Sequence, residues 1–171
     1  LKKSQMDGLT EDYNQHVERG LSHHLHLVDK DEVTEMLGTD IYIGGMTNNL
    51  NGHLHPLNLC AGEARAASNL GAKIFEQTEA TGIEQGVKVR VATKSGTISA
   101  NQVLIAGNAY HHLEARKLSG LVFPAGSFII ATEPLSDNLA RKINRDDVAV
   151  CDLNHVLDYY RLSADQRLLY G

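Results

Sequence analysis

The stretch NGHLHPLNLCAGEARAASNLGAKIFE, residues 51–76, decides how the rest of the chain is interpreted. Pro56 has no backbone N–H to donate, which is harmless in the first turn of a helix. His55 is pushed to extended geometry by the proline after it, so we expect it to be the N-cap residue. The helix is expected to run to Leu70 and to stop at Gly71, because glycine commonly terminates helices.

The predicted helix has a face of mostly small side chains, which permits close packing against a sheet. These are Leu57, Cys60, Ala61, Ala64 and Ala67. A buried strand, AKIF (72–75), is expected next, followed by an amphipathic hairpin in GVKVRVATKSGTISA (86–100). The continuous apolar run QVLIAGNAY (102–110) is typical of a central parallel strand covered on both faces.

The segments on either side of this region follow different patterns. DKDEVTEMLG (29–38) predicts a short helix that Asp29 or Asp31 caps and Gly38 ends, and DIYIGGM (40–46) predicts a short strand. After residue 120 the pattern is mainly that of an antiparallel sheet, interrupted by one helix within 136–143 that Ser136 can cap. Its expected strands lie within 121–135, 147–152, 156–163 and 166–171. The overall pattern predicts a fold of class α/β plus α+β.

Composition excludes several classes of function. A net charge of −5, with no run of Lys or Arg, argues against nucleic acid or an anionic membrane as the partner. No apolar stretch approaches the roughly 20 residues that span a bilayer, and the N-terminus lacks the apolar core of a signal peptide. Only two cysteines are present, which favours a reducing, cytoplasmic setting. Because the chain begins at Leu1 and stops within a predicted strand, we expect it to be a fragment of a longer polypeptide.

The order of these segments resembles a known family of flavoproteins. The segments GHLHPLNLCAGEARAASNLGAKIFEQTEATGI, VRVATKSGTISANQVLIAGNAY, IIATEPL and DYYRLSADQRLLYG are collinear with the middle of the D-amino acid oxidase superfamily. Within that superfamily they are most similar to the gamma-glutamylputrescine oxidase-like amine oxidases. The resemblance runs from about residue 29 to residue 171, and its long collinear order is more specific than any single motif.

The resemblance implies three incomplete parts of a larger protein. Residues 1–54 would be the first part of a substrate domain with an antiparallel sheet. Residues 55–115 would be the central part of an FAD-binding α/β domain with a β-hairpin or meander, and residues 116–171 the second part of the substrate domain. The family's N-terminal glycine-rich loop and its C-terminal flavin-contacting segment are absent from this sequence, so its partners would include the missing parts of the same polypeptide.

The resemblance also implies FAD as the cofactor and an amine or amino acid as the substrate. The flavin would accept a hydride from the carbon that bears nitrogen, giving an imine, and no residue of the chain is assigned as a general base. Ala106 and Gly107 end the apolar strand predicted within 102–110, where small residues let a ligand approach the backbone. A tight turn explains the glycine equally well from local sequence, but the resembled family has its flavin beside this strand end. The resemblance places Ala80 where backbone groups contact the adenine.

Three residues are expected to contact substrate. Arg161, on a predicted strand, could present its planar fork to a carboxylate, as an arginine in the corresponding region of related amino acid oxidases does. The alternative is an exposed or ion-paired arginine. Tyr159 and Tyr160 point to opposite faces of a strand, so only one can line a pocket, and Tyr160 is the predicted one. His53 is the third, because its strand runs near the active-site side in the resembled family.

The histidines raise a competing hypothesis of metal binding. His53 and His55 share a face if their segment is a strand, and a third ligand would make a zinc site. No Cys or carboxylate lies at ligand spacing, so we predict no metal and interpret His55 as the helix cap. His23, His24 and His26 are interpreted as parts of a solvated connector.

Two alternative functions stay open at this point. One is a flavin oxidase with a different substrate, such as glycine, sarcosine or a 2-hydroxy acid. The other is a non-catalytic binding or assembly module. A glycine-rich flavin loop upstream in the full gene would support the enzyme, whereas a native start at residue 1 would support the module.

Overall fold

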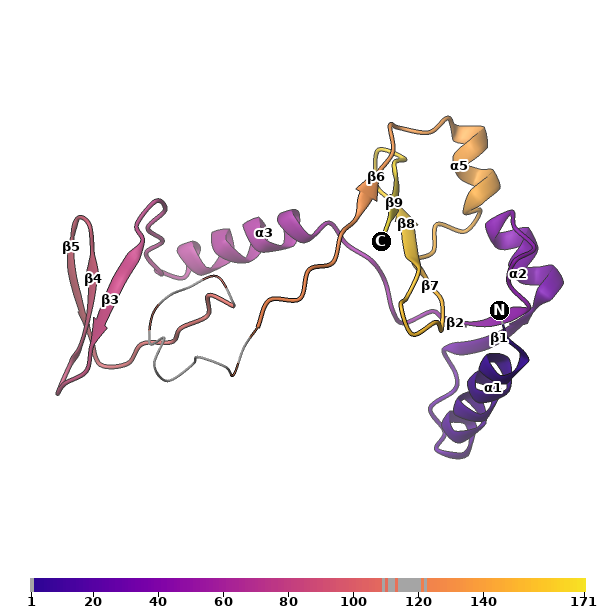
Figure 1. Ribbon diagram of the computed structural model, residues 1–171, viewed down its shortest axis with the longest axis horizontal. Helices are drawn as coiled ribbons and strands as arrows, with labels where there is room; N and C mark the ends of the chain where they lie inside the picture. The colour runs from indigo at the N-terminus through magenta and orange to yellow at the C-terminus, as the bar shows by residue number, and fades with distance from the viewer. Residues whose placement is uncertain (1, 109, 111–112, 114–120, 122) are drawn as a thin grey trace. The chain divides into compact units, whose positions relative to one another are not determined.

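A computed structural model describes residues 2–108, 110, 113, 121 and 123–171 of the chain (Figure 1). The chain forms two compact units. Unit 1 combines Leu1–Leu59 with Ser127–Gly171, and unit 2 consists of Cys60–Gly126. The assignment of these parts to a substrate domain and a cofactor domain stays a prediction.

The N-terminal half of unit 1 pairs two strands and adds two helices. In chain order the elements are α1 (Lys3–Glu18), β1 (Leu25–Asp29), α2 (Lys30–Leu37) and β2 (Gly44–Asn48). The strands β1 and β2 are antiparallel. The predicted helix at 29–38 is confirmed: the Asp29 carboxylate accepts from the Glu32 N–H, and the Glu32 side chain accepts from the Asp29 N–H. Gly38 ends α2 in the left-handed conformation, with φ of 62°.

The C-terminal half of unit 1 is the predicted antiparallel sheet with its helix. Its elements are β6 (Ile130–Ala131), α5 (Asp137–Ile143), β7 (Val150–Cys151), β8 (Tyr159–Leu162) and β9 (Leu168–Tyr170). The strand order is β6-β9-β8-β7, and each neighbouring pair is antiparallel. Ser136 caps α5 by accepting from the Leu139 N–H, as its position before the helix predicts.

A small hydrophobic core joins the two halves of unit 1. Val33 and Leu37 of α2 and Tyr42, which follows that helix, form its centre. Partly buried side chains from both halves pack around it: Val28, Met36, Val148, Val150 and Tyr160. The core therefore holds the first 60 residues against a segment that lies about 100 residues later in the sequence.

Unit 2 contains a three-stranded antiparallel sheet. Its strands are β3 (Ala80–Glu84), β4 (Val89–Thr93) and β5 (Gly96–Ala100), in the order β3-β4-β5. The predicted hairpin is confirmed, because Val89–Thr93 pairs with Gly96–Ala100 across a turn at Lys94 and Ser95. The helix α3 (Pro56–Asn69) precedes this sheet in the chain. It begins at Pro56 as predicted, and His55 Nδ1 accepts from the Asn58 N–H at 3.3 Å.

The buried strand predicted at 72–75 and the parallel strand predicted within 102–110 are not formed in the described residues. Residues 72–75 and 102–107 are irregular, and side chains such as Phe75 and Leu104 are exposed, the latter by 89%. A strand covered on both faces needs neighbouring strands for its backbone hydrogen bonds, and neither segment is paired with a strand in the described part of the chain. The small face of α3 is likewise not packed against a sheet, since no residue of that helix is buried.

Two further expectations need correction. The strand predicted at 40–46 lies later, at Gly44–Asn48, because the hydrogen-bonding partner β1 begins only opposite Asn48 and ends opposite Gly44. The three histidines expected in a solvated connector do not all lie in a connector. His26 lies in β1, and His24 is partly buried with its ring against that of His23.

The broad class is nevertheless the predicted mixture of helices with antiparallel sheets. Within the described residues, no helix has the length and apolarity needed to cross a membrane.

Gly38 gives a prediction about the stability of unit 1. A Cβ at this position would collide with the Lys142 carbonyl oxygen of α5, and the positive φ already strains any other residue. Gly38→Ala should therefore lower the free energy of unfolding by roughly 2 to 5 kcal/mol, combining backbone strain with a steric clash. Chemical denaturation of the wild-type and variant proteins measures the difference.

Gly20→Ala is the matched control for this prediction. Gly20 also has a positive φ of 69°, but a Cβ there would meet nothing within 4 Å. This variant should lose only the strain component, about 1 kcal/mol. Equal losses for the two variants would show that α2 and α5 do not approach each other as closely as described.

Candidate functional site

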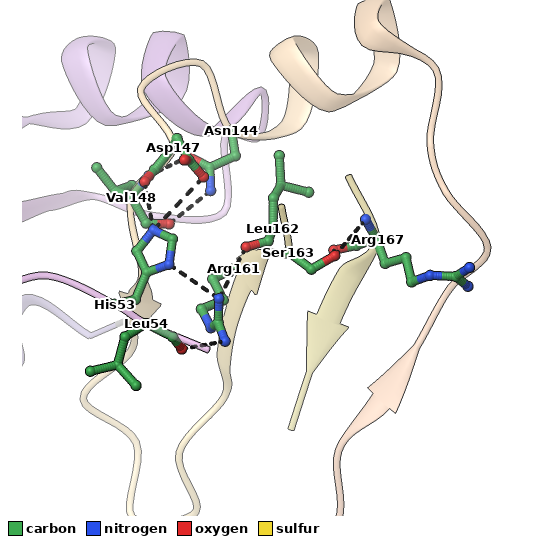
Figure 2. Close-up of polar contacts among 9 residues, drawn as sticks. All are labelled: His53, Leu54, Asn144, Asp147, Val148, Arg161, Leu162, Ser163 and Arg167. Carbon is green, nitrogen blue, oxygen red and sulfur yellow. Dashed lines mark hydrogen bonds and ion pairs between the residues drawn. The ribbon is translucent and has the colours of Figure 1, made fainter. Parts of the chain in front are cut away.

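Arg161 lies on β8 and is held by three neutral acceptors (Figure 2). Its Nη1 group donates to His53 Nδ1 at 3.2 Å and to the Leu162 carbonyl oxygen at 3.3 Å. Its Nη2 group donates to the Leu54 carbonyl oxygen at 3.0 Å. Both predicted residues, His53 and Arg161, are thus brought together within unit 1 although 108 positions separate them.

His53 sits between Arg161 and the loop that follows α5. Its Nε2 lies 3.0 Å from the Asp147 carbonyl oxygen. A carbonyl can only accept, so this contact requires a proton on Nε2. The opposite nitrogen, Nδ1, then carries the lone pair that accepts from Arg161. The two contacts together select one neutral tautomer of the imidazole.

The loop that carries Asp147 is fixed by Asn144, the residue after α5. Its side-chain amide donates to the Val148 carbonyl oxygen at 2.7 Å, and its side-chain oxygen accepts from the Val148 N–H at 2.9 Å. Only 3% of Asn144 is exposed, so this closed pair of hydrogen bonds is shielded from water. The backbone of Asp147 is consequently held in a left-handed turn, with φ of 50°.

The same loop is also tied to α2 by charge. Arg145 contacts Glu35 at 2.6 Å and makes two hydrogen bonds of 2.9 Å to Asp146. The hydrogen bond from Arg145 lowers the pKa of the Asp146 carboxyl. The Arg145 N–H further donates to the Met36 carbonyl oxygen at 2.8 Å. These contacts hold the Asp147 carbonyl in position for His53.

The electrostatic state of Arg161 differs from that of its neighbours. Arg145 is paired with Glu35 and Asp146, and Arg167 lies 2.8 Å from Asp165. Arg161 is half-buried, and among the described residues it has no carboxylate within ion-pair distance. The predicted alternative of an ion-paired arginine is therefore not what the described part of the chain shows. An anionic ligand group could supply the missing countercharge.

A cleft of about 1080 Å³ opens beside this cluster within unit 1. It is lined by residues of α1, β1, α2 and β2 and by the segment 146–153. His53 is among its lining residues, and Arg161 is not. His53 therefore connects the cleft to the Arg161 guanidinium.

The structure does not bring Tyr160 to the same place. Tyr160 packs against the core around Tyr42, and burial raises the pKa of its hydroxyl. Its ring stacks on that of Tyr170, with centroids 6.0 Å apart. Because side chains alternate along a strand, Tyr160 and Arg161 point to opposite faces of β8. Its predicted contact with substrate stays untested, but its described contacts are those of a core residue.

The predicted cofactor-binding residues lie in unit 2. Ala80 is the first residue of β3 and is paired with Thr93, whereas Ala106 and Gly107 lie in an exposed irregular segment. Exposed residues with at most a methyl side chain leave room for a ligand against the backbone, which fits contact with a flavin. None of the three carries a charge for the pyrophosphate. They can thus provide only part of a cofactor site.

The metal hypothesis finds no support in the described ranges. They contain no group of three or more His, Cys, Asp or Glu residues placed to hold an ion. His53 uses both ring nitrogens in hydrogen bonds, and His55 Nδ1 caps α3.

The sequence analysis did not identify Asn144 and Asp147 as residues that hold His53 in place. The run Asn-Arg-Asp-Asp after a predicted helix indicates a turn. Nothing in that pattern identifies the carbonyl group that faces a histidine 94 residues away. Their role depends on tertiary contacts alone.

The chain is similar in sequence and in structure to known oxidoreductases. The chain is 42% identical to "Probable oxidoreductase OrdL" of Haemophilus influenzae over all of its length, and 38% identical to "Gamma-glutamylputrescine oxidoreductase" of Escherichia coli over 94% of it. It spans 41% and 38% of those two proteins. The crystal structure of glycine oxidase from Geobacillus kaustophilus superposes with a TM-score of 0.71 at 22% identity, covering 100% of this chain and 45% of that one.

The family model described as "FAD dependent oxidoreductase" matches residues 2–171. It therefore covers nearly every residue of both units. The resemblance drawn from the order of the sequence segments is confirmed, and so is its implied cofactor. The chain belongs to the DAO family of FAD-dependent oxidoreductases.

Proposed function

We propose that this chain forms part of a longer enzyme that oxidises a primary or secondary amine carrying a carboxylate. The observation that supports this most directly is the Arg161 guanidinium, half-buried and contacted in the described ranges only by neutral acceptors. A cation left in this state gains most from an anionic ligand, and a planar guanidinium matches a carboxylate in geometry. Arg161 is accordingly the proposed anchor for the substrate carboxylate.

The name of the Escherichia coli relative supports an amine substrate of this kind. That protein is a gamma-glutamylputrescine oxidoreductase, and a gamma-glutamyl group carries a free α-carboxylate. The present chain is 38% identical to it, and we extend the substrate class to this chain on that basis. We therefore propose oxidation at the carbon bearing nitrogen, with an imine product that water hydrolyses. The proposed setting is cytoplasmic, and the pathway is the breakdown of polyamines.

The protein's own contribution to this reaction is binding and orientation. Arg161 would hold the carboxylate end of the substrate, so that the carbon bearing nitrogen is presented at a fixed distance from that anchor. His53, beside Arg161 and lining the cleft, would border the same site. FAD, when bound, supplies the hydride acceptor. In unit 2, Ala80, Ala106 and Gly107 would contact FAD through their backbones.

Arg161→Leu tests the substrate anchor. In the full-length enzyme the variant should lose a charge-assisted bidentate contact of about 1.5 to 3 kcal/mol. The expected loss in kcat/KM is roughly tenfold to a hundredfold on a carboxylate-bearing amine. A matched amine without the carboxylate should be affected by less than about threefold, as steady-state kinetics on both substrates will show.

Arg167→Leu serves as the control. Arg167 is already paired with Asp165 and also donates to the Thr132 carbonyl oxygen at 3.0 Å. Its loss should reduce activity on both substrates alike, if it reduces activity at all. The anchor proposal is wrong if Arg161→Leu also affects both substrates equally or affects neither.

Gly107→Val tests the proposed flavin contact. A branched side chain at this exposed position should occupy space against the backbone where the cofactor is expected, so the full-length variant should purify with less than about half of its flavin. Its circular dichroism spectrum should be unchanged. The ratio of flavin to protein absorbance measures the occupancy.

Gly62→Val is the control for this substitution. Gly62 lies in α3, where an added Cβ meets nothing within 4 Å, so flavin occupancy should stay at the wild-type level. Full flavin occupancy in Gly107→Val would remove residue 107 from the cofactor site.

A further inference from the structure

We propose that His53 is a positioning residue for Arg161, held in a single neutral tautomer by the Asp147 carbonyl. This inference rests on the proposed role of Arg161 as the carboxylate anchor. It differs from a direct substrate contact, because both ring nitrogens of His53 are already used by the protein. The effect of His53 on the substrate is therefore exerted through the guanidinium.

The first step of the argument concerns the donors of Arg161. A guanidinium has five N–H donors in a fixed plane. Nη1 uses two of them on His53 and Leu162, and Nη2 uses one on Leu54. The Nε–H and the second Nη2–H have no partner among the described residues. Nε and Nη2 form one edge of the guanidinium, and a carboxylate can bind side-on along such an edge.

The second step concerns the charge of the acceptor on the opposite side. His53 Nδ1 and the two carbonyl oxygens orient the guanidinium without neutralising it. A carboxylate in place of His53 would make the same hydrogen bond and also cancel the charge that the substrate needs. A neutral acceptor at residue 53 thus orients the Arg161 guanidinium and leaves its positive charge unpaired.

The third step is the control of the His53 tautomer. The Asp147 carbonyl keeps the proton on Nε2, and the buried Asn144–Val148 hydrogen bonds keep that carbonyl in place (Figure 2). The Asp147 carboxylate lies farther away, at 3.8 Å from Nε2, and is 71% exposed, so water screens it. A proton on Nδ1 would oppose the Arg161 donor at 3.2 Å. Both neighbours of the ring therefore favour the same tautomer.

A pair of isosteric variants separates orientation from charge. His53→Asn and His53→Asp both place an oxygen near the position of Nδ1, but only the second oxygen is charged. In the full-length enzyme, His53→Asn should change KM for a carboxylate-bearing amine by less than about threefold, since a neutral acceptor is retained. His53→Asp should raise that KM by roughly tenfold to a hundredfold, because Arg161 is neutralised. For His53→Asp the rise in KM should exceed the fall in kcat, because the proposed loss is one of substrate binding.

A second measurement does not depend on turnover. In ¹⁵N spectra of histidine-labelled enzyme, the signals lost in His53→Asn should be those of a neutral imidazole protonated at Nε2. Signals of the opposite tautomer, or of a doubly protonated ring, would overturn the proposal. Equal KM values for His53→Asn and His53→Asp would overturn it too, as would a change confined to kcat.

The proposed function and this inference fail in distinguishable ways. If Arg161→Leu shows no selective effect on carboxylate substrates, the anchor itself is wrong. If Arg161→Leu is selective but the two His53 variants behave alike, the anchor stands and the positioning role of His53 is wrong. Thermal unfolding of each variant identifies any that are merely destabilised. If only one of the two variants folds, the ¹⁵N signals lost in that variant decide the proposal in place of the KM comparison.

Discussion

The packing of α2 against the segment 142–150 is the constraint on which unit 1 depends. Val33 and Leu37 of that helix meet Val148 and Val150 in the core, and Gly38 lies against the backbone of Lys142. This contact joins two parts of the sequence that are about 100 residues apart. Without it the turn at Asn144 would have no fixed relation to the segment carrying His53. The cluster around Arg161 is therefore a consequence of how the core closes.

Electrostatics gives this cluster its chemical character. A half-buried guanidinium is costly unless its donors are satisfied, and the three neutral acceptors satisfy most of them without supplying a negative charge. The charges of Arg145 and Arg167 are instead neutralised by carboxylates, so these two arginines have a structural role. The guanidinium of Arg161 therefore keeps an un-neutralised positive charge, and one of its edges has donors that can bind an anion. That difference is the basis on which we propose a substrate-binding role for Arg161.

Unit 2 shows what local sequence cannot provide by itself. Its hairpin forms because β3, β4 and β5 hydrogen-bond to one another within 21 residues. The runs at 72–75 and 102–107 have the composition of buried strands, but the described residues offer them no neighbouring strand. Side chains such as Phe75 and Leu104 consequently stay exposed. A strand covered on both faces is a property of a complete sheet.

The sequence by itself determined the features that depend on near neighbours. The caps of α2, α3 and α5, the stop at Gly38 and the hairpin at 89–100 all involve residues a few positions apart. The order of the sequence segments along the chain was enough to identify the family and its cofactor. Only the tertiary structure decided that His53 meets Arg161, that Asp147 selects the tautomer, and that Tyr160 faces the core. The physical reason is that hydrogen bonds between residues 94 or 108 positions apart depend on how the core closes, which no local pattern encodes.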